Sequence, residues 1–315
     1  MKTNAIVRII LLSLAILVLA GILFFGLALG GLIADFTGTE IYQEIMGDPS
    51  DVIVLVDGDG KTATYAAGDI NALEINWVAG SIRIEPMDTD VITVREDAVS
   101  QQKYEMVLKK SGRTLSIDFC KDEITRIGIS NFASFNKDLV ITVPRNWTCR
   151  ELELDVASAE VYIADMTIDK VDFDGASGEL RLNNCHVDTL DLDTASGDVE
   201  FVGALNELEC DAASANCNIE VTNIPSRINI DCASGDLDLT LPENCGFSCD
   251  MDTLSGDFSS DFSTVMNNGR YTYGNGACRI DLSGMSGDIT IHKAAAAADN
   301  AEETQPSGNH SDGNF

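Results

Sequence analysis

Carboxylates at fixed distances from a repeated motif are the residues of this chain with the clearest potential for chemistry. The motif reads Ala-Ser-Gly-Asp or close to it, and an aspartate stands three positions before its serine in six copies: Asp155, Asp174, Asp193, Asp211, Asp231 and Asp252. Acids also stand five positions before the serine, Asp172 and Asp191 among them, and directly after the motif glycine. Carboxylate oxygens are ligands that Ca²⁺ prefers. If consecutive copies stack, these acids form outward ladders that could bind divalent cations, with Ca²⁺ the expected ion.

A second interpretation gives the same acids no ligand. Two unit charges at the 4.8 Å spacing of stacked strands repel by about 0.9 kcal/mol in water. Such charges keep an extracellular repeat protein soluble and stop its sheets from associating. The glycine-rich nonapeptide of calcium-dependent β-rolls is absent. The sequence leaves both interpretations open.

The motif serine has a structural rather than a catalytic pattern. Nucleophilic catalysis needs one activated serine with a base beside it, whereas this serine recurs seven times. Only three histidines are present: His186, His292 and His310. None is placed to activate a Ser or Cys. Paired carboxylates would suit a polysaccharide-cleaving enzyme, but outward aromatic residues that could stack on sugars are scarce, with Tyr162 the main exception. We therefore predict no enzymatic activity and no cofactor beyond the Ca²⁺ considered above.

The spacing of the motif predicts the element that positions these acids. The motif serines are Ser158, Ser177, Ser196, Ser214, Ser234, Ser255 and Ser286. Their successive gaps are 19, 19, 18, 20, 21 and 31 residues. A nearly constant period this short, made of strand-like segments, indicates stacked β-rungs.

The apolar residues around the motif change phase across it. Val171 and Phe173 stand at even offsets before Ser177, whereas Leu180 and Leu182 stand at odd offsets after it. One continuous strand keeps a single phase, so the motif must hold a bend in which glycine supplies backbone freedom and serine a local hydrogen bond. With a third apolar group in each repeat, we predict an all-β fold, a single-stranded parallel β-solenoid with rungs of about 19–21 residues. An antiparallel sandwich would not explain the recurring phase break.

The nine cysteines do not encode a systematic set of disulfides. Five of them occupy inward positions and resemble small apolar residues: Cys185, Cys210, Cys217, Cys232 and Cys249. Cys245 and Cys249 could close a small loop. The remaining three have no assigned position in the rungs: Cys120, Cys149 and Cys278.

Charge and hydropathy predict a membrane-anchored extracytoplasmic protein. The net charge is −31, which excludes nucleic acid as a partner. Residues 9–34 carry no charge and are long enough to cross a bilayer as a helix. A cleaved signal peptide, the alternative, usually has a shorter apolar stretch. Lys2 and Arg8 precede this segment, so we expect residues 1–8 in the cytoplasm and 35–315 outside, on a single-pass anchor in the cell membrane.

The remaining segments complete the predicted domain organisation. Residues 35–70 contain an Asp-Gly turn between short apolar runs and are expected to form a linker with a capping hairpin. Residues 71–293 form the solenoid. Residues 294–315 are polar and low in apolar content, which predicts a disordered tail.

Two stretches carry a family resemblance. They are Leu-x-Leu-Asp-x-Ala-Ser-Gly-Asp-Val-x-Phe at 190–201 and Ile-Asn-Trp-Val-Ala-Gly-Ser-Ile-Arg-Ile-Glu-Pro at 75–86. With the other repeats, over about 70–293, the chain resembles the bacterial β-strand-repeat family labelled "putative adhesin", domain of unknown function family 4097. The resemblance implies a membrane-tethered or secreted β-solenoid of the bacterial envelope, and it carries over no catalytic residue.

Three functions are compatible with these features. The first is a non-enzymatic adhesion or interaction module that presents an acidic outer face to an unknown protein or surface ligand. The second is a sensory or regulatory ectodomain that works with other envelope membrane proteins, because the cytoplasmic stub is too short to signal alone. The third, a polysaccharide-active β-helix enzyme, has the least support. In each case the lipid bilayer is a partner through residues 9–34.

Overall fold

The structure, a computed structural model, describes residues 62–98, 106–120, 137–253 and 255–295. The predicted stub, membrane anchor, most of the linker and most of the tail lie outside these ranges. Within them the chain is all-β, with a single short 3-10 turn at Ala67–Asp69. No helix in the described ranges is long and apolar enough to cross a membrane. The strands are β1 (Thr62–Ala66), β2 (Ala72–Met87), β3 (Val91–Ala98), β4 (Val107–Ser111), β5 (Thr114–Asp118), β6 (Lys137–Pro144), β7 (Thr148–Ala164), β8 (Thr167–Val221), β9 (Arg227–Ser234), β10 (Leu237–Leu241), β11 (Phe247–Thr253), β12 (Phe258–Ser260), β13 (Val265–Asn267), β14 (Arg270–Tyr273), β15 (Cys278–Ser286) and β16 (Ile289–Lys293).

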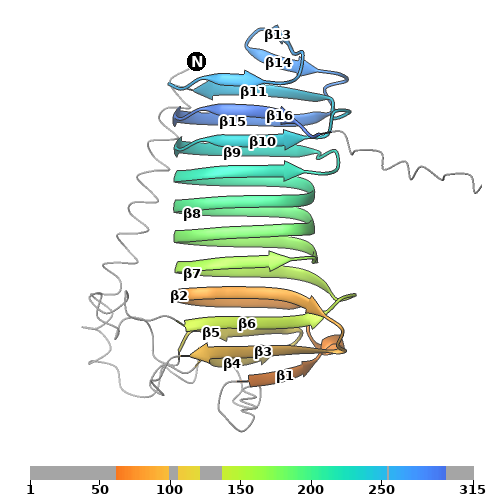
Figure 1. The fold of residues 1–315 in the computed structure, drawn as a ribbon, viewed down its shortest axis with the longest axis vertical. Helices are drawn as coiled ribbons and strands as arrows, with labels where there is room; N and C mark the ends of the chain where they lie inside the picture. Colours follow the sequence, from red (N-terminus) through yellow and green to blue (C-terminus); the bar gives the residue numbers. More distant parts are fainter. Residues whose placement is uncertain (1–61, 99–105, 121–136, 254, 296–315) are drawn as a thin grey trace, which may run out of the picture.

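The middle of the molecule is a stack of parallel rungs (Figure 1). β7 pairs with β8 in a register that places Ser158 opposite Ser177, one repeat later. β9 and β10 pair in parallel with β8 at the other end of its run, one repeat further along the chain. The motif period is therefore the length of one rung, and the predicted all-β fold of stacked rungs is confirmed.

Each rung has two walls that enclose a thin apolar core. Beyond β8 the walls separate into two series of paired strands, β9–β15–β11 and β10–β16–β12. Val171 and Phe173 of one wall and Leu180 and Leu182 of the other are all buried. Ser177 lies at the corner between these pairs, so the predicted reversal of facing across the motif is confirmed.

The motif corner explains why glycine recurs there. Gly197 has φ +128°, and a Cβ on it would lie 1.9 Å from the carbonyl oxygen of Gly178 in the adjacent rung. A side chain at this position would block the stacking of the backbones. The predicted local hydrogen bond of the serine is wrong, because Ser196 Oγ donates to the carbonyl of Ala176 in the adjacent rung, at 3.3 Å. The rungs are close enough at the corner for the hydroxyl to link them.

The last rung of the sequence is not the last rung in space. β15 pairs in parallel with β9 on one side and with β11 on the other, and β16 likewise lies between β10 and β12 (Figure 1). The chain therefore passes over one rung position, builds β11 to β14, and returns to fill the gap. The hairpin of β13 and β14 occupies the long interval before Ser286. We call β15 and β16 the interposed rung.

The N-terminal end has a similar inversion. β2 pairs with β7 along its length, and on its other side with β5 and β6, which follow it in the chain. The strands β3 and β1 then add to β6 in antiparallel order and end that side of the stack (Figure 1). Both ends of the stack thus place one rung out of sequence order.

Candidate acidic interaction face

The aspartates three positions before the motif serine form a continuous outward row in the middle of the stack. The row is Asp155, Asp174, Asp193, Asp211 and Asp231, and we call it the Asp ladder. Asp155 is in register with Asp174, and Asp211 with Asp231. The even alternation of the pre-motif strands turns these side chains away from the core, while their apolar neighbours are buried.

Asp252, the sixth predicted member, does not adjoin the others. The interposed rung places Ser283 between Asp231 and Asp252, because Ser283 pairs with both positions. The prediction of a sixth member rested on rungs that stack in chain order. The row of consecutive aspartates therefore ends at Asp231.

The Asp ladder concentrates negative charge that the fold does not neutralise. In the parts of the chain that the structure describes, none of its five carboxylates lies within ion-pair distance of a Lys, Arg or His. Burial, and then the neighbouring charge of Asp231 and Asp193, raises the pKa of Asp211 to about 6. Burial followed by repulsion from nearby acids also raises the pKa of Asp155, Asp174, Asp193 and Asp231.

Two ladder members lie close enough to interact directly. The carboxyl of Asp155 is within hydrogen-bonding reach of that of Asp174, and this contact contributes to the raised pKa of Asp155. Two carboxyl groups can form such a bond only when one of them is protonated, so loss of that proton leaves two like charges side by side. The ladder thus stores electrostatic repulsion that a bound cation would relieve.

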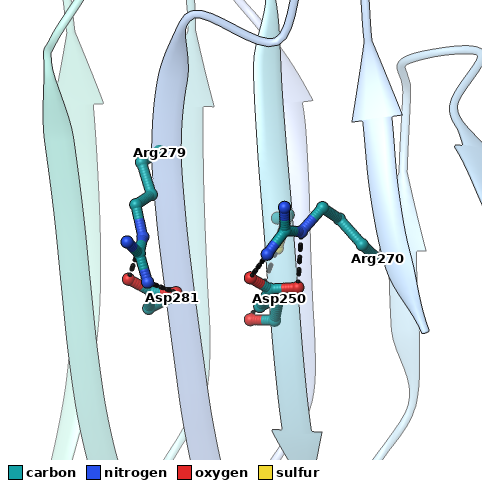
Figure 2. Close-up of polar contacts among 5 residues, drawn as sticks. Asp250, Arg270, Arg279 and Asp281 are labelled. Atoms are coloured by element: carbon teal, nitrogen blue, oxygen red, sulfur yellow. Dashed lines mark hydrogen bonds and ion pairs between the residues drawn. The ribbon is translucent and has the colours of Figure 1, made fainter. Parts of the chain in front are cut away.

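The neighbouring column, five positions before the serine, is different because basic side chains interrupt it. Lys170 pairs with the predicted residues Asp172 and Asp191, the latter at 3.9 Å. Arg270 binds Asp250 through two hydrogen bonds of 2.8 and 2.6 Å, and this contact lowers the pKa of Asp250 (Figure 2).

Arg279 likewise pairs with Asp281, at 2.9 Å (Figure 2). In the close-up, Arg279 and Asp281 both lie on β15, whereas Arg270 of β14 reaches across to Asp250 of β11. This second column is therefore partly neutralised and bound into the fold, whereas no aspartate of the Asp ladder forms an ion pair with another described residue.

The acids that follow the motif glycine serve the fold. Asp236 Oδ1 accepts the backbone N–H of Asp288 at 2.9 Å, and Asp288 Oδ1 accepts that of Asp257 at 2.9 Å. Asn216 continues the same series, since its side chain bonds Asp198 and the N–H of Asp236. The sequence predicted an outward ladder at these positions but did not reveal the backbone bonds of Asp236 and Asp288, because these bonds depend on the order of the rungs in space.

Metal binding by the eight predicted aspartates stays a prediction. Within the described ranges, no group of three or more His, Cys, Asp or Glu side chains is arranged to hold a metal ion. Five of the eight lie in the Asp ladder, two are bound by Lys170, and Asp252 is separated by Ser283.

The histidines described by the structure form no catalytic pair with a nucleophile. His292 Nδ1 and Nε2 each lie 3.3 Å from a carboxylate, of Asp261 and of Asp238 respectively. These contacts connect the interposed rung to the rungs on both sides. His186 is exposed, and its backbone N–H bonds the carbonyl of Met166.

The structure changes the interpretation of the cysteines. No disulfide joins any of the nine within the described ranges. Cys245, which the sequence suggested could bridge to Cys249, instead hydrogen-bonds to Cys278. Cys210 and Cys217 also contact each other, although they stand in different columns. Sequence spacing could not reveal either contact, because one pair depends on the interposed rung and the other faces across the core.

Comparison with known proteins identifies the repeat region. A model of the family described as Toastrack DUF4097 matches residues 70–292. No curated protein matches the chain.

Solved bacterial structures resemble the chain at low identity. A "putative cell adhesion protein" from Clostridium sporogenes is 14% identical, with 74% of this chain and 99% of that chain covered and a TM-score of 0.33. A "putative adhesin" from Parabacteroides distasonis is 13% identical, with 75% and 98% covered and a TM-score of 0.38. A "putative lipid binding protein" from the same species is 15% identical, with 76% and 98% covered and a TM-score of 0.32. Their names say nothing about what this chain binds.

Proposed function

The chain belongs to the Toastrack DUF4097 family, and from this premise we propose that it is a non-enzymatic adhesion or interaction module that binds a cationic partner through the Asp ladder. The observation that carries the proposal is the row of five outward aspartates without a basic counterpart among the described residues. Neighbouring columns have such counterparts or bond the backbone. The carboxylates of the Asp ladder therefore remain available to pair with positive charges on a partner.

The shape of the ladder suits a binding surface. Its members stand on successive parallel strands, whose spacing is about 4.8 Å. The backbone beneath them is fixed on both sides by neighbouring rungs, so little conformational entropy is lost when a partner binds. A partner with a row of lysines or arginines would complement this surface and lower the repulsion between the aspartates.

We further propose that the module stands outside the cell on a membrane anchor. The support is the uncharged segment 9–34, preceded by Lys2 and Arg8 and followed by an acidic chain. In this arrangement residues 35–315 meet partners at the cell surface, and residues 9–34 contact the bilayer. Ca²⁺, which is abundant outside cells, would compete with the cationic partner for the same carboxylates.

Binding of a lysine-rich peptide to the full chain in detergent tests the proposal. The ladder variant Asp174→Asn/Asp193→Asn/Asp211→Asn removes three charges from the ladder. The matched control Glu85→Gln/Asp90→Asn/Glu220→Gln removes three charges from elsewhere on the surface, so both proteins have a net charge of −31 + 3 = −28. We expect the ladder variant to bind at least about tenfold more weakly than the control.

Two outcomes of this experiment would overturn the proposal. Equal weakening in both variants would mean that only total charge matters. Unchanged binding in the ladder variant would mean that the peptide binds another surface. Addition of millimolar Ca²⁺ in the same assay should weaken peptide binding to the wild-type chain more than to the ladder variant.

A further inference from the structure

Cys245 and Cys278 meet where the interposed rung joins its outer neighbour. Cys245 lies in the turn before β11, and its N–H donates to the carbonyl of Pro242 at 2.9 Å. Cys278 begins β15, and its N–H donates to the carbonyl of Gly246 at 2.9 Å. The register pairs Cys278 with Phe247, two residues after Cys245. Cys245 and Cys278 are far apart in the sequence, but their backbone segments lie next to each other.

The two side chains are also in contact. Both residues are completely buried, and a hydrogen bond joins their thiols. This bond lowers the pKa of Cys245 and raises that of Cys278. A thiol pair with one more acidic member favours the thiolate that begins disulfide exchange.

The backbone brings the two residues together. The N–H of Cys278 bonds the carbonyl of Gly246, the residue that follows Cys245, and a disulfide needs two Cα atoms roughly 4.4–6.8 Å apart. Cys210 and Cys217 also touch, but they extend from the two opposite walls of a rung. The first pair combines thiol contact with a backbone hydrogen bond at the neighbouring residue.

We propose that Cys245 and Cys278 form a disulfide that fastens the interposed rung to β11. The two thiols together lose two protons and two electrons, and a sulfur–sulfur bond forms between them. A small-molecule or protein disulfide accepts the electrons and protons and is reduced to two thiols. Oxidising compartments favour this exchange, so its occurrence in cells rests on the extracytoplasmic location proposed above, whereas its occurrence in vitro does not.

The disulfide has a defined structural effect. It closes a loop that contains β11 to β14, and it joins the rung built earlier to the rung that fills the gap. A cross-link of this kind restricts the unfolded chain and thereby stabilises the folded one. It also prevents the last-arriving strands from leaving the stack.

Peptide mapping of the wild-type full chain is the direct test. The chain is refolded in detergent with a mixture of reduced and oxidised glutathione, alkylated, and digested with trypsin without reduction. Trypsin releases residues 228–270 with Cys245 and residues 271–279 with Cys278 as the only cysteine. We expect these two peptides to be linked, and we expect oxidation to raise the melting temperature by about 5–10 °C.

Variants identify the linked residues. Cys245→Ala and Cys278→Ala should each abolish the linked peptide and the gain in melting temperature. Cys249→Ala is the matched control, since Cys249 is buried, lies in the same peptide and should leave the link intact. Absence of the linked peptides from the refolded wild-type chain would overturn the proposal, as would their persistence in Cys245→Ala. Peptide binding by the Asp ladder should not change in either redox state, which separates this test from that of the proposed function.

Discussion

The two ends of the stack are covered by different kinds of interaction. Each end holds a rung out of sequence order, and each must cover strands that would otherwise leave open edges. At the N-terminal end the cover contains a buried ion pair, Lys137 Nζ to Glu96 at 2.9 Å. The ammonium also lies 4.4 Å from the ring centre of Phe119 and 4.9 Å from that of Trp77.

The C-terminal end is covered mainly by aromatic rings. Phe262 packs edge-on against Phe247 at 5.2 Å and against Tyr273 at 4.7 Å between ring centres. Lys293 Nζ lies over two rings of this cluster, 5.3 Å from the centre of Phe262 and 5.8 Å from that of Tyr273. Cys245 and Cys278 lie beside the same cluster.

The two covers specify the order of their rungs through different interactions. A buried ion pair adds little net stability, but it strongly penalises any arrangement that separates its partners. Aromatic packing tolerates more rearrangement. The N-terminal order is therefore specified by polar complementarity, and the C-terminal order by shape together with the proposed disulfide.

Removal of the Lys137 charge should have the largest effect. Lys137→Ala leaves the buried Glu96 without its counter-charge, so we expect the free energy of unfolding in urea to fall by about 3–5 kcal/mol. Glu96 also accepts the N–H of Met106, and that bond cannot replace an ion pair. The double variant Lys137→Met/Glu96→Gln should recover most of the loss. A loss below about 1 kcal/mol in Lys137→Ala would refute the polar specification of this end.

Addition of a methyl group at the corner of the interposed rung should have the next largest effect on stability. Gly287 has φ +132°, and a Cβ on it would lie 1.8 Å from the carbonyl oxygen of Gly235. We expect Gly287→Ala to reduce the free energy of unfolding by about 1–3 kcal/mol or to displace the rung. Gly68→Ala is the control, since nothing lies near its Cβ position, and it should change stability by less than about 0.5 kcal/mol. Equal effects of the two changes would mean that the rungs are not in contact at this corner.

The middle of the stack should respond to pH through Asp211. The raised pKa of Asp211, about 6, means that the folded chain holds a proton which the unfolded chain has already lost above about pH 4. The contribution of Asp211 to stability is therefore fully present below about pH 4 and is lost as the pH rises through 6. At pH 7.5 we expect Asp211→Asn to stabilise the chain by about 1 kcal/mol, after allowance for solvent screening. Thermal melting across this range, with Asp90→Asn as the control, measures the effect, and stability that rises from pH 5 to 7 in both wild type and Asp211→Asn would contradict it.

The smallest effect is expected at the exposed histidine of the interposed rung. His292 contacts Asp238 and Asp261, which lie on the rungs to either side. Exposed pairs of this type contribute about 0–1 kcal/mol, so His292→Gln should change the melting temperature only slightly. A loss comparable with that of Gly287→Ala would show that this polar contact, rather than backbone stacking, holds the interposed rung.

The sequence predicted the rung well because the rung is a local feature. The phase change around Ser177 and the glycine of the motif determine the corner, and both are visible within a dozen residues. The outward direction of the Asp ladder follows from the same alternation. These features do not depend on which rung lies next to which.

The order of the rungs could not be predicted, because the period is compatible with more than one order. The spacing from Ser234 to Ser255 suits direct stacking, yet the structure places Ser286 opposite Ser234. The only signal was the long gap before Ser286. The separation of Asp252 from the Asp ladder and the contact of Cys245 with Cys278 both follow from this order, so the sequence missed them together.

The interposed rung also determines how the stack responds to mechanical force. A terminal rung in simple order is held along one side and can be peeled away strand by strand. β15 and β16 are held along both sides, so tension applied at residue 295 must shear them from two neighbours at once. On a protein anchored at one end and loaded at the other, this arrangement places strands that are paired on both sides at the point where the load enters.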